Sequence, residues 1–150
     1  MNANVRYSFD TNILFYASDS AAGEKYQRAL SLTDSAIGHD CVLTLQSLGE
    51  LSAAIIRRRA ASVERAQRIV RSYRASFPIV PAIEADLDDA LLAHRLHNIP
   101  FWDAMLWTTA RRAGCTLILT EDFEDGRMLG GVSLRNPFLL SAAELDALLQ

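Results

Sequence analysis

The sequence predicts an α/β fold in which helices cover both faces of a central, mainly parallel sheet. Short apolar stretches alternate along the chain with longer stretches of helical periodicity, which is the pattern of strands joined by helices. Residues 116–120 (TLILT) are apolar or β-branched throughout, as is typical of a central parallel strand. The chain has 150 residues, of which 50% are hydrophobic. It is therefore long enough to bury a sizeable core, and we expect residues 1–150 to form a single domain.

The first half of the chain is expected to begin with a strand at residues 5–9 that leads into a short helix near Asn12. Residues 22–36 are a loosely amphipathic helix, and residues 40–44 a second strand. From residue 45 to residue 56 apolar side chains recur every three or four positions, which predicts a helix. Another helix follows at residues 62–77, with apolar residues on one face and arginines on the other.

The second half continues the alternation. Its expected elements are an extended segment at residues 77–81, a helix at 83–97, a helix from 101 to 114, the strand 116–120, a turn-rich loop around Gly126, Gly130 and Gly131, a last strand at 132–134 and a terminal helix. Acidic residues in the first turn favour the helix at 83–97. Ser141 and Glu144 are spaced as a capping box for the terminal helix.

Several protein classes are excluded by the composition. No apolar run approaches the roughly 20 residues that a membrane span needs. Residues 1–6 have neither the apolar core of a signal peptide nor an arginine-rich amphipathic pattern. We therefore expect a cytoplasmic protein without membrane association. Cys41 and Cys115 lie far apart in apolar surroundings, with no second Cys or His at metal-ligand spacing, which favours buried free thiols.

The net charge of -3 hides an uneven distribution. Residues 57–74 contain seven arginines and one glutamate, so this segment carries +6 and the rest of the chain -9. Two interpretations stay open: a solvated helix face, or a strip that contacts the RNA backbone. The RNA-contact candidates are Arg57, Arg58, Arg65 and Arg68.

Four carboxylates stand out because their surroundings are apolar or because they follow a strand. Asp10 follows the first strand, Glu50 and Asp103 lie in apolar helices, and Asp122 follows the strand 116–120 with Glu121 beside it. Each has an ordinary explanation, such as a helix cap, a buried ion-pair partner or a turn residue. A carboxylate in an apolar stretch is nevertheless costly unless something pairs with it.

A shared metal site explains the four acids together. The carboxyl ends of parallel strands form the edge at which ligands bind in open α/β sheets, so all four acids can face one cleft. Carboxylates held close together repel one another unless a divalent cation compensates, and oxygen ligands suit Mg²⁺ or Mn²⁺. We therefore interpret Asp10 as the central metal ligand and assign the helix-capping role to Asn12 or Thr11.

These residues resemble a known family. The order of motifs is that of PIN-domain ribonucleases, and especially of the VapC toxins of bacterial toxin-antitoxin pairs: Asp10-Thr11-Asn12 after a strand, Glu50 in an apolar helix, Trp102-Asp103-Ala104 opening a later helix, Leu119 to Phe123 (LTEDF) after the central strand, and Asn136-Pro137-Phe138. The resemblance covers roughly residues 5–138.

The resemblance implies a three-layer α/β/α PIN-like fold and a Mg²⁺- or Mn²⁺-dependent endoribonuclease toxin that hydrolyses single-stranded RNA and is silenced by an antitoxin protein. The family's acidic quartet falls on Asp10, Glu50, Asp103 and Asp122, and its supporting residues fall on Asn12 and Thr120. Asp122 has a competitor, because Glu121 can supply the oxygen instead. The family also implies a homodimer, and an acidic cleft that receives an arginine from the antitoxin.

Other functions fit less well. A haloacid-dehalogenase-type phosphatase needs a second Asp two residues after the first, where this chain has Asn12, and it needs a lysine, of which the chain has only Lys25. The glycine-rich turn of nucleotide-binding folds is missing. The alternative from a different class is a non-catalytic RNA- or partner-binding PIN-like module.

Overall fold

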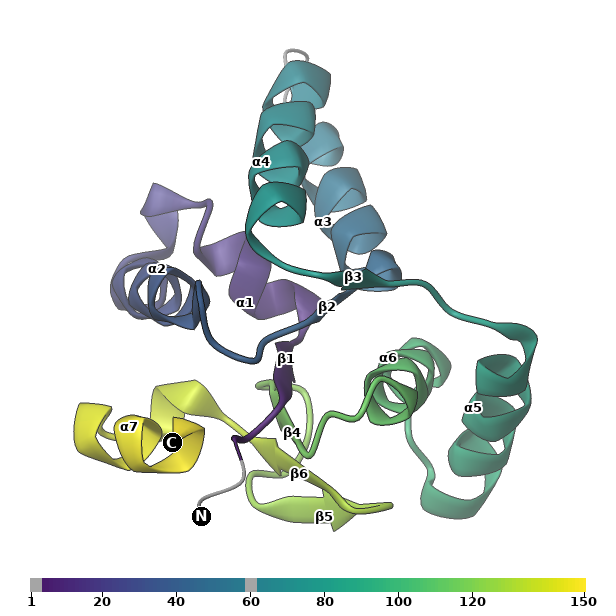
Figure 1. Cartoon of the computed structure of the whole chain (residues 1–150). Coiled ribbons are helices and arrows are strands. Elements are labelled where there is room, and N and C mark those ends of the chain that lie inside the picture. Colours follow the sequence, from purple (N-terminus) through teal and green to yellow (C-terminus); the bar gives the residue numbers. More distant parts are fainter. Residues whose placement is uncertain (1–3, 59–61) are drawn as a thin grey trace.

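The fold is a sheet of short strands with helices on both faces, seen in a computed structural model that describes residues 4–58 and 62–150 (Figure 1). Arg59, part of the predicted basic segment, lies outside these residues. In chain order the elements are β1 (Tyr7–Phe9), α1 (Thr11–Tyr16), η1 (Ser20–Ala22), α2 (Glu24–Ala36), β2 (Leu43–Thr44), α3 (Leu45–Arg58), α4 (Ser62–Ser76), β3 (Ile79–Val80), α5 (Glu84–His97), α6 (Phe101–Arg112), β4 (Leu117–Leu119), β5 (Arg127–Leu129), β6 (Val132–Arg135), η2 (Pro137–Leu139) and α7 (Ala142–Leu149).

The strands form a mainly parallel sheet, as predicted. Its order is β1-β4-β6-β5, in which β1 pairs with β4 and β4 with β6 in parallel, while β5 is antiparallel to β6. The parallel pair of β2 and β3 lies beyond β1, joined to it by a parallel bridge between Tyr7 and Cys41. The apolar strand at the centre of the prediction, β4, is flanked by a strand on each side.

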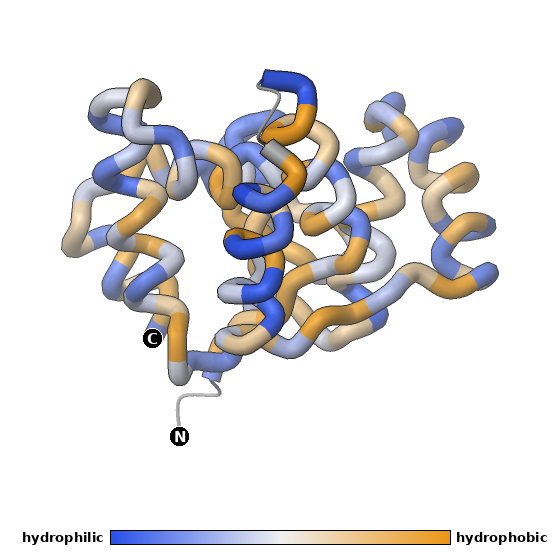
Figure 2. Tube along the Cα trace, turned by 90° about the horizontal axis from the view of Figure 1, so that it is seen from above, coloured by the Kyte–Doolittle hydropathy of each residue, from blue (hydrophilic) through white to orange (hydrophobic). Residues whose placement is uncertain are grey.

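Two hydrophobic cores, one on each face of the sheet, confirm the three-layer arrangement. Alternate residues of β4 point to opposite faces: Leu117 and Leu119 belong to one core, and Ile118 to the other. The first core is covered by α1, α2, α3, α4 and α7, and the second by α5 and α6. Figure 2 shows that hydrophobic and hydrophilic residues alternate along the helices, as expected for helices with one buried face.

One strand was missed. The predicted loop around Gly126 and Gly131 contains β5, which forms a hairpin with β6. The turn consists of Gly130 and Gly131, both with positive φ (54° and 80°), between the paired residues Leu129 and Val132. A two-residue turn of this kind is a strong hairpin signal, because glycine adopts positive φ without strain.

The sheet topology brings the predicted acids to one edge. Asp10 follows β1 directly and Thr120 follows β4, and these strands are parallel neighbours. The backbone N–H of Asp10 donates to the carbonyl of Leu119 at 2.9 Å, which joins the two strand ends. Within the described ranges, no helix is both long and apolar enough to cross a membrane.

Candidate metal centre

Asp10 lies at the junction between β1 and α1 and bonds in two directions. Its backbone is extended (φ -68°, ψ 156°), and its Oδ1 accepts the N–H of Thr11 at 2.6 Å, so Asp10 is itself the N-cap of α1. Its Oδ2 accepts the hydroxyl of Thr120 at 2.8 Å. The side chain is only 6% exposed. The prediction that Asn12 or Thr11 caps this helix is therefore wrong.

The physical reason is the position of Asp10 along the chain. The residue that precedes the first helical residue is the one whose side chain can reach the free N–H groups of the first turn. Thr11 and Asn12 are already inside α1. A carboxylate has two oxygens with several lone pairs, so capping and metal binding do not exclude each other.

Asp122 is held against Asp10 by the two predicted supporting residues. The Thr120 hydroxyl, which donates to Asp10, also accepts the backbone N–H of Asp122 at 3.1 Å. Asn12 Nδ2 donates to both carboxylate oxygens of Asp122, at 3.2 and 3.3 Å. These contacts connect the segment after β4 to the first turn of α1.

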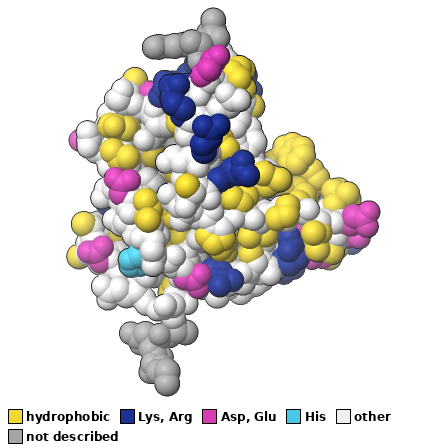
Figure 3. Space-filling view, turned by 45° about the horizontal axis from the view of Figure 1, so that its top comes forward, with side chains coloured by type: hydrophobic (Ala, Val, Ile, Leu, Met, Phe, Trp, Pro, Cys, Tyr) yellow, Lys and Arg dark blue, Asp and Glu magenta, His cyan; other side chains and the backbone are white. Residues whose placement is uncertain are grey.

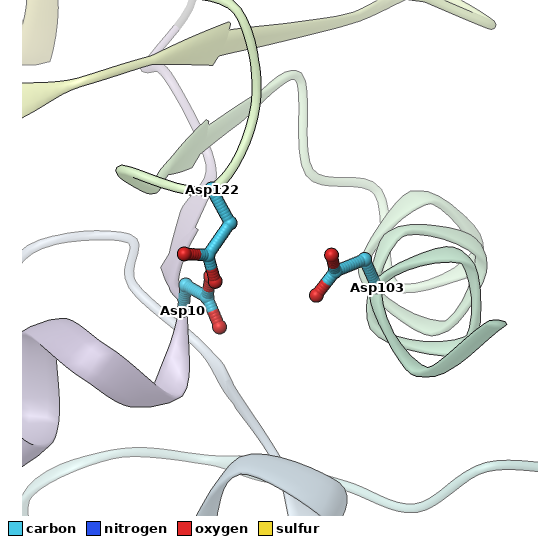
Figure 4. Close-up of side chains that lie close together, drawn as sticks. All are labelled: Asp10, Asp103 and Asp122. Carbon is cyan, nitrogen blue, oxygen red and sulfur yellow. The ribbon is translucent and has the colours of Figure 1, made fainter. Parts of the chain in front are cut away.

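Asp103 faces these two carboxylates from α6, which covers the face of the sheet opposite to that covered by α1. It lies in the first turn of α6, and Figure 4 shows its side chain pointing toward Asp10 and Asp122. One oxygen from each of the three carboxylates lies within 4.8 Å of the others. Asp10 is buried, Asp103 half-buried and Asp122 exposed, so the cluster opens to solvent on one side.

Crowding makes the ionised form of this cluster costly. Burial raises the pKa of Asp10 to about 8, with Asp122 adding to the shift and the Thr120 hydrogen bond opposing it. Burial also raises the pKa of Asp103 to about 6, helped by the charges of Asp122 and Glu50. In residues 4–58 and 62–150, no ion pair involves Asp10, Asp103 or Asp122. Three oxygen donors that lack a cationic partner fit a hard divalent ion such as Mg²⁺ or Mn²⁺.

Glu50, the fourth predicted acid, lies beside this cluster rather than within it. It is exposed on α3, and its Oε1 accepts a 2.6 Å hydrogen bond from Gln46 Nε2. Gln46 Nε2 also donates to the carbonyl of Trp102 at 2.9 Å, next to Asp103. Gln46 thus joins α3 to the first turn of α6. Gln46 is not among the predicted site residues, although its spacing of four residues from Glu50 is a readable signal on a helix.

The structure distinguishes Asp122 from its neighbour Glu121. Tyr16 donates its hydroxyl proton to Glu121 Oε1, and Lys25 Nζ lies 2.8 Å from Glu121 Oε2. Glu121 is therefore engaged by two groups outside the acidic cluster, whereas Asp122 belongs to it. Lys25 and Tyr16 were not among the predicted site residues.

The arginine candidates lie on the projecting hairpin of α3 and α4. Figure 3 shows a row of basic side chains over this face. Arg57 and Arg68 are exposed. Arg58 pairs with Asp19 at 2.9 Å and covers the ring of Phe15, 4.6 Å from its centroid. Arg65 Nη2 donates to the carbonyl of Ser18.

Fold and site together define an α/β/α protein with a carboxylate centre at the carboxyl edge of its parallel strands. The sequence model of the PIN domain matches residues 7–124, well over half of the chain. The chain belongs to the PIN domain family.

Solved structures with the same fold include several toxin proteins. VapC20 of Mycobacterium tuberculosis, described as a sarcin-ricin loop cleaving toxin, has a TM-score of 0.61 and 17% identity, over 79% of this chain and 89% of that one. A toxin-antitoxin complex from Klebsiella pneumoniae has a TM-score of 0.64 and 19% identity, over 87% and 97%. VapBC2 of Rickettsia felis, bound to promoter DNA, has a TM-score of 0.64 and 17% identity, over 88% and 98%. No curated protein matches the sequence.

Proposed function

We propose that this chain, as one domain, is a metal-dependent endoribonuclease toxin of the VapC type that hydrolyses phosphodiester bonds in single-stranded regions of RNA. The observation that carries the proposal is the cluster of Asp10, Asp103 and Asp122 at the sheet edge of a PIN domain. Oxygen-only clusters of this kind are built for divalent ions, and divalent ions are the usual catalysts of phosphodiester hydrolysis.

In this proposal Asp10, Asp103 and Asp122 hold Mg²⁺ or Mn²⁺, with Glu50 completing the quartet. When bound, the ion supplies positive charge that activates a water for in-line attack on phosphorus and stabilises the leaving oxygen. Thr120 and Asn12 keep the carboxylates of Asp10 and Asp122 in place through the hydrogen bonds described above. No covalent enzyme intermediate is involved.

The four arginine candidates on α3 and α4 form the surface that we propose to bind the RNA backbone. An acidic cleft repels phosphates, so a basic surface beside it is needed to bring the substrate in. All four candidates are exposed, and two of them have partners, because Arg58 pairs with Asp19 and Arg65 donates to the carbonyl of Ser18. The solvated-face interpretation predicts that their removal leaves RNA affinity unchanged.

The proposed partner is a cognate antitoxin, as in the toxin-antitoxin complexes that share this fold. We propose that it blocks the acidic cleft with an arginine, a charge-assisted contact. We also propose that the chain forms a homodimer, because α5 exposes a leucine-rich surface (Leu87 44%, Leu91 52%, Leu96 61%) that a second copy can cover. A cytoplasmic location is part of the same proposal, because the RNA substrate is found there.

The test is RNA hydrolysis by the purified chain, freed of any antitoxin, in Mg²⁺ or Mn²⁺. We expect wild type to cleave and Asp103→Asn to be inactive. Asp88→Asn is the matched control, because it removes the same charge from an exposed position on α5; it should cleave like wild type. If wild type and Asp103→Asn leave the RNA equally intact, the nuclease function is wrong and the non-catalytic binding module is favoured.

A further inference from the structure

Glu121 lies between Thr120 and Asp122 in the chain, yet its side chain belongs to a separate contact group. This group consists of Tyr16, Lys25, Glu121 and Phe138, which we call the Lys25 clasp. Lys25 Nζ pairs with Glu121 at 2.8 Å and lies over two aromatic rings, 5.0 Å from the centroid of Tyr16 and 5.3 Å from that of Phe138. The two rings meet edge to face with centroids 5.6 Å apart. The ammonium group thus holds one carboxylate and two aromatic faces together.

Through the clasp, the segment after β4 contacts α1 at both of its ends. Thr120 donates to Asp10 at the N-cap, and Asp122 accepts from Asn12 in the first turn. Glu121 accepts from Tyr16, the last residue of the helix. A helix of six residues is too short to be stable by itself, so its position depends on contacts of this kind.

This arrangement links the clasp to the acidic centre. Residues 121–123 form a bend after β4, and Glu121 and Asp122 both contact α1 from this bend, through Tyr16 and Asn12. Because the two residues share one peptide unit, a Glu121 side chain held by Tyr16 and Lys25 restricts the backbone that presents Asp122 to Asp10. Lys25 also neutralises Glu121, whose side chain is only 17% exposed. Without that partner, Glu121 would add an uncompensated negative charge next to Asp122 in the chain, close to carboxylates that already repel one another.

We propose that Lys25 is a positioning residue of the metal centre: by holding Glu121 outward it fixes Asp122 in the geometry that binds the divalent ion. The proposal rests on the proposed function, because it assigns a role toward the ion of the same site. Among the described residues, the ion-pair partner of Lys25 is Glu121 and not a member of the acidic cluster, so Lys25 acts through Glu121.

The first experiment measures Mn²⁺ affinity of the full chain by calorimetry, without RNA. Lys25→Met should weaken binding roughly 10-fold, the lower end of the effect of partners that orient metal ligands. Lys25→Arg keeps the charge and should restore most of the affinity. The matched control is Arg6→Met, which removes another surface ion pair of 2.9 Å, with Asp40, before the start of β1; it should bind Mn²⁺ like wild type.

A double variant separates the charge of Glu121 from the fold. In a Glu121→Gln background, residue 121 has no charge for Lys25 to neutralise. Lys25→Met should therefore lower the Mn²⁺ affinity much less in this background than in wild type. Equal losses in both backgrounds would overturn the proposal. The comparison also identifies a general folding defect, because such a defect would lower the Mn²⁺ affinity equally in both backgrounds.

Chemical modification gives an independent readout, because Lys25 is the only lysine of the chain. An amine-acetylating reagent should weaken Mn²⁺ binding by wild type but not by Lys25→Arg, which offers the reagent only the amino terminus. Unchanged Mn²⁺ affinity in Lys25→Met and in acetylated wild type would overturn the role of Lys25 and leave the proposed function intact. Failure of wild type itself to bind Mn²⁺ would overturn both.

Discussion

Replacing Asp10 by Asn should stabilise the metal-free protein while destroying the proposed metal site. Asn is nearly isosteric with Asp, and its Oδ1 can still accept the N–H of Thr11. Its Nδ2 can donate to the Thr120 hydroxyl, which reverses the direction of the hydrogen bond that Thr120 donates to Asp10. The substitution therefore removes a buried charge and keeps the hydrogen bonds. Stability and metal binding should change in opposite directions.

The magnitude follows from the pKa of Asp10, which burial raises from 3.8 to about 8 in the folded chain. The pKa of 3.8 applies to the unfolded chain and the pKa of about 8 to the folded chain. At a pH between these values the folded state holds a proton on Asp10 that the unfolded state has released. The free energy of unfolding therefore falls as pH rises, by about 1.4 kcal/mol per pH unit. Over the whole window the upper limit is about 6 kcal/mol. Water entry from the exposed side of the cluster reduces this, and we expect Asp10→Asn to be more stable than wild type by about 3 kcal/mol at pH 9.

The assay is denaturant unfolding of both proteins in EDTA from pH 5 to pH 9. Wild type should lose stability up to about pH 8, whereas Asp10→Asn should lose little above pH 6, where the remaining contribution of Asp103 ends. Added Mn²⁺ should restore wild type at pH 9, by about 2.7 kcal/mol at 100 times the dissociation constant. It should not affect the variant. Parallel pH profiles, or a variant less stable than wild type at pH 9, would refute the reasoning.

Three further predictions concern the same fold. Mn²⁺ affinity of wild type should rise with pH from about 6 to about 8 in a calorimetric titration, because protons compete with the ion at Asp103 and Asp10; a flat profile would contradict the pKa assignments. Asp86 is 1% exposed and accepts three hydrogen bonds from Arg112 at 2.9 to 3.1 Å. Asp86→Ala should lower the free energy of unfolding by about 3 kcal/mol, because a partner of a partly buried charge is lost, and a loss below 1 kcal/mol in denaturant unfolding would show the pair to be a weak surface contact. Gly130→Ala should cost about 1 to 2 kcal/mol in the same assay, because φ is positive there and the new Cβ would lie 2.8 Å from the Trp107 ring; an unchanged midpoint would mean that the hairpin moves freely.

The order of strands and helices could be predicted because its signals are local. Apolar periodicity marked α3, and a β-branched run marked β4. The strand 132–134 is predicted and corresponds to β6, whereas β5 falls in the predicted loop. Its hairpin with β6 is also readable, since Gly130-Gly131 between apolar residues is a turn signal. The strands β2 and β3 have two residues each, too few for any periodicity to fix their bounds.

The candidate site could be predicted in part: three of the four predicted acids lie together, and Asn12 and Thr120 hydrogen-bond to them, whereas the contacts of Gln46, Tyr16 and Lys25 have no signal strong enough to be predicted. Asp10 was given one role because sequence reasoning treats cap and ligand as alternatives, whereas its two oxygens allow both. The pairing of Lys25 with Glu121 joins residues 96 positions apart. No periodicity or motif in one sequence links such a pair; only the folded sheet brings them together.

The central claim is that the three-carboxylate cluster holds the ion on which RNA hydrolysis depends. The most direct measurement is one Mn²⁺ titration of wild type in which binding and RNA cleavage are followed together, with Asp103→Asn as the control. We predict that cleavage rises with occupancy of the Mn²⁺ site and reaches half its maximum at the same Mn²⁺ concentration, and that Asp103→Asn loses both. Cleavage that proceeds fully in EDTA, or that survives in Asp103→Asn, would contradict the account.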